Sequence, residues 1–234
     1  MFVKSKYLNN LSWNLNKDKT PYPFVFIDSF LKTETYKEIT EKFPTLKTFE
    51  NYGDIKGNNI QIRVAFNNFS QELDLFWKEF GSYFLNSDFF YNFCEFYEDD
   101  IKYLYPKIYH GIKKKNFKIG IQGIDNFEKC DVLLDFQIGI NTPVKEVTSV
   151  RGPHLDNKKT IYTALCYLKD SDDDTNSGHF TIYQLKRFKL LGLGSSRSIS
   201  LSDVKNYQEI KYRSNRVASF LNTKKSIHGV TQRE

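Results

Sequence analysis

The chain has 234 residues, of which 40% are hydrophobic and 26% charged, a length and composition typical of one globular domain. This composition excludes intrinsic disorder, and no run of about 20 apolar residues indicates a membrane span. The N-terminus also lacks the apolar core of about 7–15 residues that a secretory signal needs. We therefore expect a single soluble domain, residues 1–234, in the cytoplasm.

The net charge of +6 does not by itself predict a nucleic-acid partner, because the lysines are spread along the chain. Their densest run, HGIKKKNFK at 110–118, predicts a solvated helix end. A preference for anionic substrates remains an open alternative. The chain has an odd number of cysteines at wide spacings: Cys94, Cys130 and Cys166. This pattern predicts buried reduced thiols instead of disulfides or a zinc site.

The first half of the chain, residues 1–117, is predicted to be mostly helical. PYPFVFIDSFL at 21–31 alternates and is rich in aromatic and β-branched residues, which indicates a short strand. TETYKEITEKF at 33–43 begins with a Thr cap and has helical apolar spacing. From about Gln71 to Ile112 the aromatic residues form helical stripes, which we interpret as core and not as cofactor contacts.

The second half, residues 118–234, is predicted to be a β core. Its short strand-like runs are separated by Gly, Asn, Asp, Ser and Pro; they are FKIGIQGI, VLLDFQIGI, TIYTALCYL, GHFTIYQL, RSISL, EIKYR and RVASFLN. Seven or eight strands at this spacing favour a sandwich, jelly roll or barrel. The predicted class is therefore α+β.

The motif HLD gives the first chemical signal. In extended backbone His154 and Asp156 point to the same face and can bind one ion. His228, in a short apolar stretch after the last strands, is the third candidate ligand. Two imidazoles and a carboxylate form the facial triad of non-haem Fe(II) oxygenases. The alternative is that Asp156 caps the following turn while His154 packs against a strand.

The chain resembles the 2-oxoglutarate/Fe(II)-dependent dioxygenases, particularly the prolyl-4-hydroxylase-like and phage or bacterial branch. PYPFVFIDSFL is similar to its P-F-P-x-x-x-x-D-x-F-L opening, HLDNKKTIYTALCYLK to its H-x-D-N…T-x-x-x-Y-L strand, GHFTIY to its G-G-x-L-x-I-Y strand, and NRVASFLNTKKSIHGV to its N-R-x-x-x-F…x-H-x-V close. The resemblance spans nearly the whole chain. It implies a double-stranded β-helix (jelly-roll, cupin-like) core with the helical half packed on it. It also implies Fe(II) held by His154, Asp156 and His228, with 2-oxoglutarate and O2 as cosubstrates.

In these relatives the far carboxylate of 2-oxoglutarate needs hydroxyl and cationic donors. Tyr167 matches the tyrosine that supplies the hydroxyl, and Thr163 lies on the same face of an extended strand. The alternative is that Tyr167 is an ordinary core residue. The matching cation lies nine or ten residues beyond the distal histidine in relatives, a position past Glu234. We therefore consider Arg233, which alternation points away from His228 unless a bulge intervenes.

Two further explanations of the missing cation are open: a C-terminal strand absent from this sequence, or Arg216 or Lys169 in the same role. We expect 2-oxoglutarate to bind weakly to the 234-residue chain. His179 replaces the second glycine of the family's G-G and is a competing metal ligand, although His228 has the expected terminal-strand context. Related halogenases have Gly or Ala where this chain has Asp156, so the resemblance favours hydroxylation.

The predicted function is hydroxylation of a C–H bond in a small molecule, a saccharide precursor or a peptide side chain. A small-molecule or saccharide substrate is favoured over a protein, with no membrane or nucleic-acid partner. The loop at 169–178 resembles that of bacterial homologues associated with surface-polysaccharide synthesis. The alternative function is a non-catalytic cupin-like module that binds a ligand or sugar.

Overall fold

A computed structural model describes residues 5–9, 17–69, 73–114, 117–169, 172–186 and 198–234. The chain folds into two compact units whose segments alternate along the sequence. Unit 1 comprises Met1–Tyr7, Glu41–Ile55 and Gln61–Ile140, and unit 2 comprises Leu8–Thr40, Lys56–Ile60 and Asn141–Glu234. The fold is mixed α+β, as predicted.

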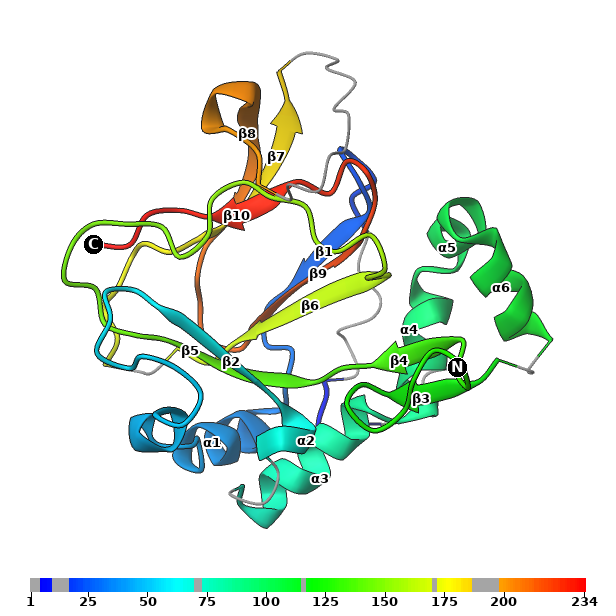
Figure 1. Cartoon of the computed structure of the whole chain (residues 1–234), viewed down its shortest axis with the longest axis horizontal. Coiled ribbons are helices and arrows are strands. Elements are labelled where there is room, and N and C mark those ends of the chain that lie inside the picture. Colours follow the sequence, from blue (N-terminus) through cyan, green and yellow to red (C-terminus); the bar gives the residue numbers. More distant parts are fainter. Residues whose placement is uncertain (1–4, 10–16, 70–72, 115–116, 170–171, 187–197) are drawn as a thin grey trace. The chain divides into compact units, whose positions relative to one another are not determined.

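Unit 1 contains most of the helices. They are α2 (Phe66–Phe69), α3 (Leu75–Phe84), α4 (Ser87–Phe96), α5 (Glu98–Leu104), α6 (Pro106–Lys113) and the 3-10 helix η2 (Leu46–Phe49). Its strands are β2 (Gln61–Ala65), β3 (Ile119–Ile121), β4 (Val132–Leu134) and β5 (Gln137–Asn141), paired as β2 with β5 and, in parallel, β3 with β4 (Figure 1). The predicted helical region thus forms four successive helices, and Gln71 lies outside the described residues.

The aromatic stripes of unit 1 form a core, as predicted. Trp77, Phe80, Phe90 and Phe93 from α3 and α4 are all buried. Gly81 allows this packing, because a Cβ there would lie 2.4 Å from the ring of Phe66. The stripe therefore stabilises the helices through burial of apolar area.

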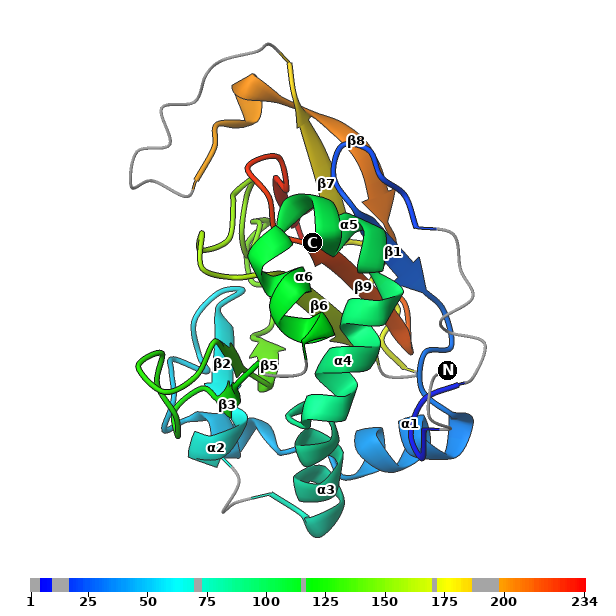
Figure 2. The ribbon, with the colours of Figure 1, turned by 90° about the vertical axis from the view of Figure 1, so that its right-hand side faces the viewer.

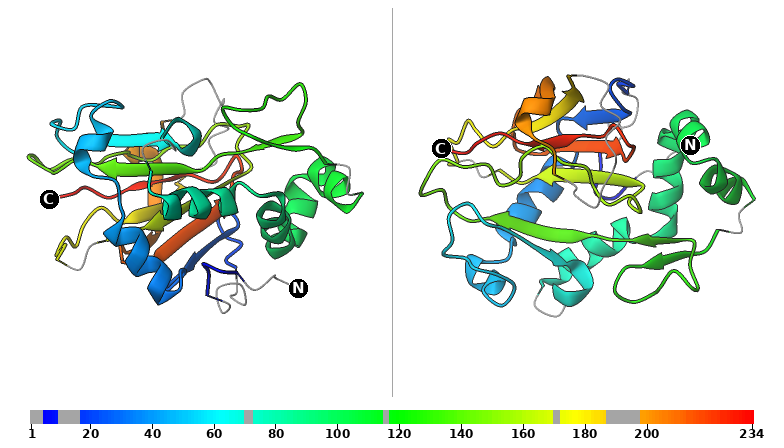
Figure 3. Two further views of the ribbon diagram at one scale, coloured as in Figure 1. Left: turned by 90° about the horizontal axis from the view of Figure 1, so that it is seen from below. Right: turned by 45° about the horizontal axis from the view of Figure 1, so that its top comes forward.

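Unit 2 is built mainly of strands. Its elements are β1 (Phe24–Ile27), α1 (Thr33–Glu41), β6 (Tyr162–Tyr167), β7 (Phe180–Leu185), the 3-10 helix η4 (Leu201–Asp203), β8 (Val204–Ile210), β9 (Arg216–Leu221) and β10 (His228–Val230). They form two antiparallel three-stranded sheets, in the orders β1-β9-β6 and β10-β7-β8. Figure 2 shows β7 and β8 side by side, and the right-hand view of Figure 3 shows β9 lying between β1 and β6.

The two sheets of unit 2 share one hydrophobic cluster. Phe24 of β1 and Phe220 of β9 pack in it with Phe180 and Ile182 of β7. All six residues of β9 are buried, as befits the central strand of its sheet. Each sheet therefore covers the apolar face of the other, and this packing holds the ends of their strands in place.

Three sequence predictions differ from the structure in this region. RSISL is not a strand: Ser198 makes a single bridge, Leu201–Asp203 is the 3-10 helix η4, and Arg197 lies outside the described residues. The hydroxyl of Ser200 accepts from the Ser202 N–H, a local bond that competes with strand pairing. Strand β8 begins earlier than EIKYR predicts and ends at Ile210. The predicted strands at 118–141 do not join the β core of unit 2. They belong to the two-stranded pairs of unit 1 instead.

The cysteines are free, as predicted, but only Cys94 is buried. Cys130 is half-buried and Cys166 is exposed, because strand alternation places Cys166 on the face of β6 opposite Leu165 and Tyr167. No helix in the described part of the chain is long and apolar enough to cross a membrane.

An ion pair between the buried guanidinium of Arg216 and the half-exposed carboxylate of Asp28 joins the strands β1 and β9 at one end. Arg216 donates from Nε to Asp28 Oδ1 at 2.6 Å and from Nη2 to Asp28 Oδ2 at 2.7 Å. The third donor, Nη1, binds the carbonyl of Lys211 at 2.8 Å. The hydrogen bond from Arg216 holds the pKa of the Asp28 carboxyl below its usual value.

We expect Asp28→Asn to lower the free energy of unfolding at pH 7 by about 1–3 kcal/mol, because it leaves the buried guanidinium without its anion. Since the folded-state pKa of Asp28 is depressed, its stabilisation is present above about pH 4 and lost as the pH falls through that pKa. Urea unfolding at pH 7 and pH 3 measures both effects. Equal stability of the two proteins at pH 7 would contradict the prediction.

Candidate metal centre

The segment HLD runs beside β10, where His154 forms an antiparallel bridge with His228. Leu155 packs in a second apolar cluster with Val204 and Ile227. His154 and Asp156, on either side of Leu155, therefore face the other way. His154 is 5% exposed and the side chain of Asp156 is 18% exposed, so both groups are largely shielded from water.

Backbone pairing brings His228 to this segment. The N–H of His154 donates to the carbonyl of His228 at 2.9 Å, and the N–H of His228 donates to the carbonyl of His154 at 3.1 Å. In an antiparallel ladder, two residues that exchange both bonds have their side chains on the same face. Accordingly, the centroids of the two imidazole rings are 4.2 Å apart.

The three predicted ligands converge on one point. Asp156 Oδ1 is 3.8 Å from His154 Nε2 and 3.7 Å from His228 Nε2, and all three ligand atoms lie within 4.8 Å of one another. Metal–ligand bonds of roughly 2.0–2.2 Å place two ligands of one ion at most about 4.4 Å apart. The distances from the carboxylate to both imidazoles are therefore compatible with a shared ion. The part of the chain that the structure describes contains this one group of potential metal ligands.

Each imidazole is oriented by a carbonyl two residues before it. His154 Nδ1 is 2.9 Å from the carbonyl oxygen of Gly152, and His228 Nδ1 is 2.8 Å from that of Ser226. A carbonyl only accepts, so in both rings Nδ1 carries the hydrogen and donates. Each Nε2 therefore keeps its lone pair, and it lies 3.8 Å (His154) or 3.7 Å (His228) from Asp156 Oδ1; metal-binding histidines use the same pattern of a hydrogen-bonded Nδ1 and a free Nε2.

Burial keeps these imidazoles neutral. It lowers the pKa of His154 to about 4, and the adjacent His228 acts in the same direction. The pKa of His228 is also lowered, chiefly by burial. Neutral imidazole is the form that binds a metal, so both ligands are available at neutral pH.

The remaining wall of the site comes from β6, β7 and β9. Thr163 of β6 donates from Oγ1 to Asp156 Oδ2 at 2.7 Å, which leaves Oδ1 turned to the imidazoles. The rings of Phe180 and Phe220 lie 5.5 and 4.5 Å from the ring of His228, centroid to centroid. These apolar rings exclude water from that side of the site.

The predicted 2-oxoglutarate contacts are placed at different distances from the triad. Thr163 contacts Asp156 directly, whereas Tyr167 lies four residues along the same face of β6 and packs against the shared cluster. The ring of Tyr167 makes an edge contact with Tyr212, with centroids 5.4 Å apart. Burial raises the pKa of Tyr167 above its usual value, so its hydroxyl stays protonated and can donate.

The candidate cations have other partners. Arg233 Nη1 donates to Asn59 Oδ1 at 2.7 Å and to the carbonyl of Thr142 at 3.2 Å. Arg216, which lies opposite Tyr167 in the register of β6 and β9, binds Asp28. Lys169 Nζ donates to the carbonyl of Thr175 and lies over the ring of Tyr212.

His179 is outside the triad. Its Nδ1 accepts from the backbone N–H of Tyr212 at 3.2 Å, and its Nε2 lies 3.8 Å from Glu209. Its backbone N–H donates to the hydroxyl of Thr231. The structure therefore groups His228, and not His179, with His154 and Asp156.

Sequence reasoning missed three residues that shape the site: Asn222, Ser226 and Gly229. Asn222 and Ser226 bracket the turn after β9 and hydrogen-bond to each other. Gly229 lies so close to the neighbouring segment that a Cβ would be 2.8 Å from the carbonyl oxygen of Gly152. The polar run NTKKS between two apolar stretches was a turn signal, but nothing in it indicated which partners these side chains would find.

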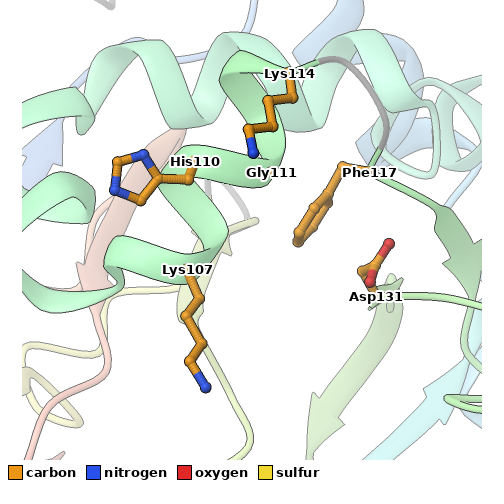
Figure 4. A pocket seen from close by; sticks show the side chains of 6 residues that line it. All are labelled: Lys107, His110, Gly111, Lys114, Phe117 and Asp131. Atoms are coloured by element: carbon orange, nitrogen blue, oxygen red, sulfur yellow. The ribbon is translucent and has the colours of Figure 1, made fainter.

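A separate groove of about 420 Å³ lies on unit 1. It is lined by Lys107, His110, Gly111, Lys114, Phe117 and Asp131 (Figure 4). Helix α6 ends at Lys113, whose Nζ pairs with Glu98 at 2.6 Å. The basic run at 110–118 therefore includes a solvated helix end, as predicted for the described residues of that run.

No family model, curated protein or solved structure matches this chain. The assignment of the site therefore depends on its own geometry.

The metal-free protein should lose stability as the pH falls from about 6.5 towards 4. In this window His154 and His228 become protonated in the unfolded state but stay neutral in the folded state, because burial lowers their folded-state pKa values. The free energy of unfolding should fall by up to about 1.4 kcal/mol per pH unit for each histidine. Urea unfolding after treatment with a chelator measures it, and the slope should be smaller in His154→Asn. A flat profile in this window would refute burial of neutral imidazoles.

Gly229→Ala should destabilise the protein and weaken metal binding. The new Cβ would lie 2.8 Å from the oxygen and 2.9 Å from the carbon of the Gly152 carbonyl, backbone atoms that can move only if the segment carrying His154 shifts. Overpacking of this kind costs about 1–3 kcal/mol.

Gly152→Ala is the matched control for stability, because a Cβ at that position meets no atom within 4 Å. Thermal unfolding of both variants tests the difference. Equal unfolding temperatures would show that the close approach at Gly229 has no energetic consequence.

Proposed function

We propose that the chain is an Fe(II)- and 2-oxoglutarate-dependent oxygenase that hydroxylates a C–H bond. The observation that supports this most directly is the convergence of two neutral imidazoles and one carboxylate on a single point. This donor set, with open positions opposite, is typical of non-haem Fe(II) sites that activate oxygen. The residues present therefore fit the metal that the resemblance implies.

The architecture of unit 2 supports the same proposal. Two antiparallel sheets share one apolar cluster, and the ligands come from β10, which belongs to one sheet, and from the segment bridged to it. We propose that these sheets are the two faces of a double-stranded β-helix. In such a fold the side chains between the sheets are shielded from water, which suits a reaction that must exclude it.

We propose that 2-oxoglutarate binds along the inner face of β6. Thr163 is beside the carboxylate of Asp156, and Tyr167 lies further along the same face with a protonated hydroxyl. That hydroxyl can donate to the far carboxylate of the cosubstrate. Of the three cations considered, Arg216 is the register neighbour of Tyr167, although the structure pairs it with Asp28.

When bound, Fe(II) with 2-oxoglutarate and O2 would supply the oxidising chemistry, which belongs to the cofactor and not to the protein. His154 and His228 would bind the ion through Nε2, and Asp156 through Oδ1. The carbonyls of Gly152 and Ser226 hold the rings in the required tautomer. Thr163 holds the carboxylate, while Phe180 and Phe220 keep water from the His228 side.

We propose a small-molecule or saccharide substrate and a cytoplasmic location. The site is buried among strands, and the loops that select a substrate vary most among proteins that share a scaffold. The loop at 169–178, which includes residues outside the described part of the chain, is a candidate for that selection.

Asp156→Ala should abolish succinate formation from 2-oxoglutarate while the chain stays folded. The carboxylate is a metal ligand in this proposal, and its side chain is not part of either apolar cluster of unit 2. Succinate measured by mass spectrometry, together with circular dichroism, tests both halves of the prediction. Asp88→Ala, at an exposed position of α4, is the control. Undiminished turnover in Asp156→Ala would refute the assignment.

The experiment that separates an oxygenase from a ligand-binding module is anaerobic addition of Fe(II) and then 2-oxoglutarate. A weak visible charge-transfer band should appear, and it should be absent in Asp156→Ala. Binding of a sugar or other ligand without this band would favour the non-catalytic module.

A further inference from the structure

The side chain of Asn222 ties down the loop that follows Asp156. Asn222 is 7% exposed at the end of β9, and its Nδ2 donates to the carbonyls of Asn157 and Thr160, both at 2.9 Å. Its backbone N–H donates to the carbonyl of Ile161 at 2.8 Å. Since Asn157 is the residue after Asp156, the amide of Asn222 holds one end of the metal-binding segment.

The same amide also reaches the residue that orients His228. Asn222 Oδ1 accepts from the hydroxyl of Ser226 at 2.9 Å, and Ser226 is fully buried. The carbonyl of Ser226 in turn accepts from His228 Nδ1 at 2.8 Å. A continuous path of hydrogen bonds and short backbone links therefore runs from the neighbour of Asp156, through Asn222, to the ring of His228.

We propose that Asn222 is a positioning residue that sets the separation between the ligand atoms of Asp156 and His228. This inference depends on the proposed metal site. The role needs two donors and one acceptor on a short side chain, and the carboxamide of asparagine supplies them. Aspartate has the same shape but would present a carboxylate to two carbonyl oxygens, and alanine would leave buried polar groups unpaired.

Asn215 provides a matched control at the opposite end of β9. Its Oδ1 accepts from the N–H of Leu31 at 2.8 Å and its Nδ2 donates to the carbonyl of Leu31 at 2.8 Å. Asn215→Asp and Asn222→Asp therefore make the same chemical change to an amide that bridges backbone groups. Only Asn222 is linked to the ligand segments, so the two variants separate positioning from general stability.

The test is titration of the 234-residue chain with Co²⁺, monitored by the visible d–d absorption of the bound ion. Asn222→Asp should weaken Co²⁺ binding about 10–100-fold and change the shape of the spectrum, as loss of a partner behind the ligands does. Asn215→Asp should bind Co²⁺ as the unmodified chain does. Ser226→Ala, which keeps the carbonyl that orients His228 but loses the hydroxyl, should weaken binding in the same direction by less.

A second measurement needs no metal. In the metal-free protein, long-range ¹H–¹⁵N correlation spectra should show the Nδ1–H tautomer of His228, and Asn222→Asp should produce a mixture of tautomers. Co²⁺ affinity and spectrum in Asn222→Asp equal to those of Asn215→Asp would overturn the positioning role and leave the metal site intact. Failure of the unmodified chain to bind Co²⁺ would overturn the metal site and this inference together.

Discussion

The candidate metal centre depends on one reciprocal pair of backbone hydrogen bonds between His154 and His228. These two residues are far apart in the sequence, and each donates its N–H to the carbonyl of the other. The pair aligns two extended segments so that both imidazoles lie on the same face. The position of Asp156 follows from this alignment, because it shares a face with His154.

Each ligand is then oriented by a different local contact. The carbonyls of Gly152 and Ser226 fix the two imidazole rings, and the hydroxyl of Thr163 fixes the carboxylate. These contacts are short and lie in a largely buried site, so the donors would need little reorganisation to bind an ion. The burial that lowers both histidine pKa values also favours the neutral form that a metal requires.

The packing of unit 2 explains why this arrangement is held firmly. His228 lies against Phe180 and Phe220, which belong to the cluster shared by the two sheets. Its neighbour Ile227 packs in the second cluster with Leu155. Both ligand segments are therefore anchored on two faces, and a shift of either one would disturb apolar packing as well as hydrogen bonds.

Local pattern alone determined the α+β class, the strand at Phe24–Ile27, the helix from Thr33 and the common face of His154 and Asp156, because backbone periodicity decides which side chains share a face. It failed at RSISL, where a serine hydroxyl favours a turn, and at Cys166, where burial depends on which face of β6 meets the core. The sequence already predicted His228 as the third ligand, but only the tertiary structure decided that its backbone pairs with that of His154, that Arg233 binds Asn59 and Thr142, and that Asn222 joins the two ligand segments. Such contacts join residues distant in sequence, and the choice of partner follows from strand register and packing, which no local stretch of residues encodes.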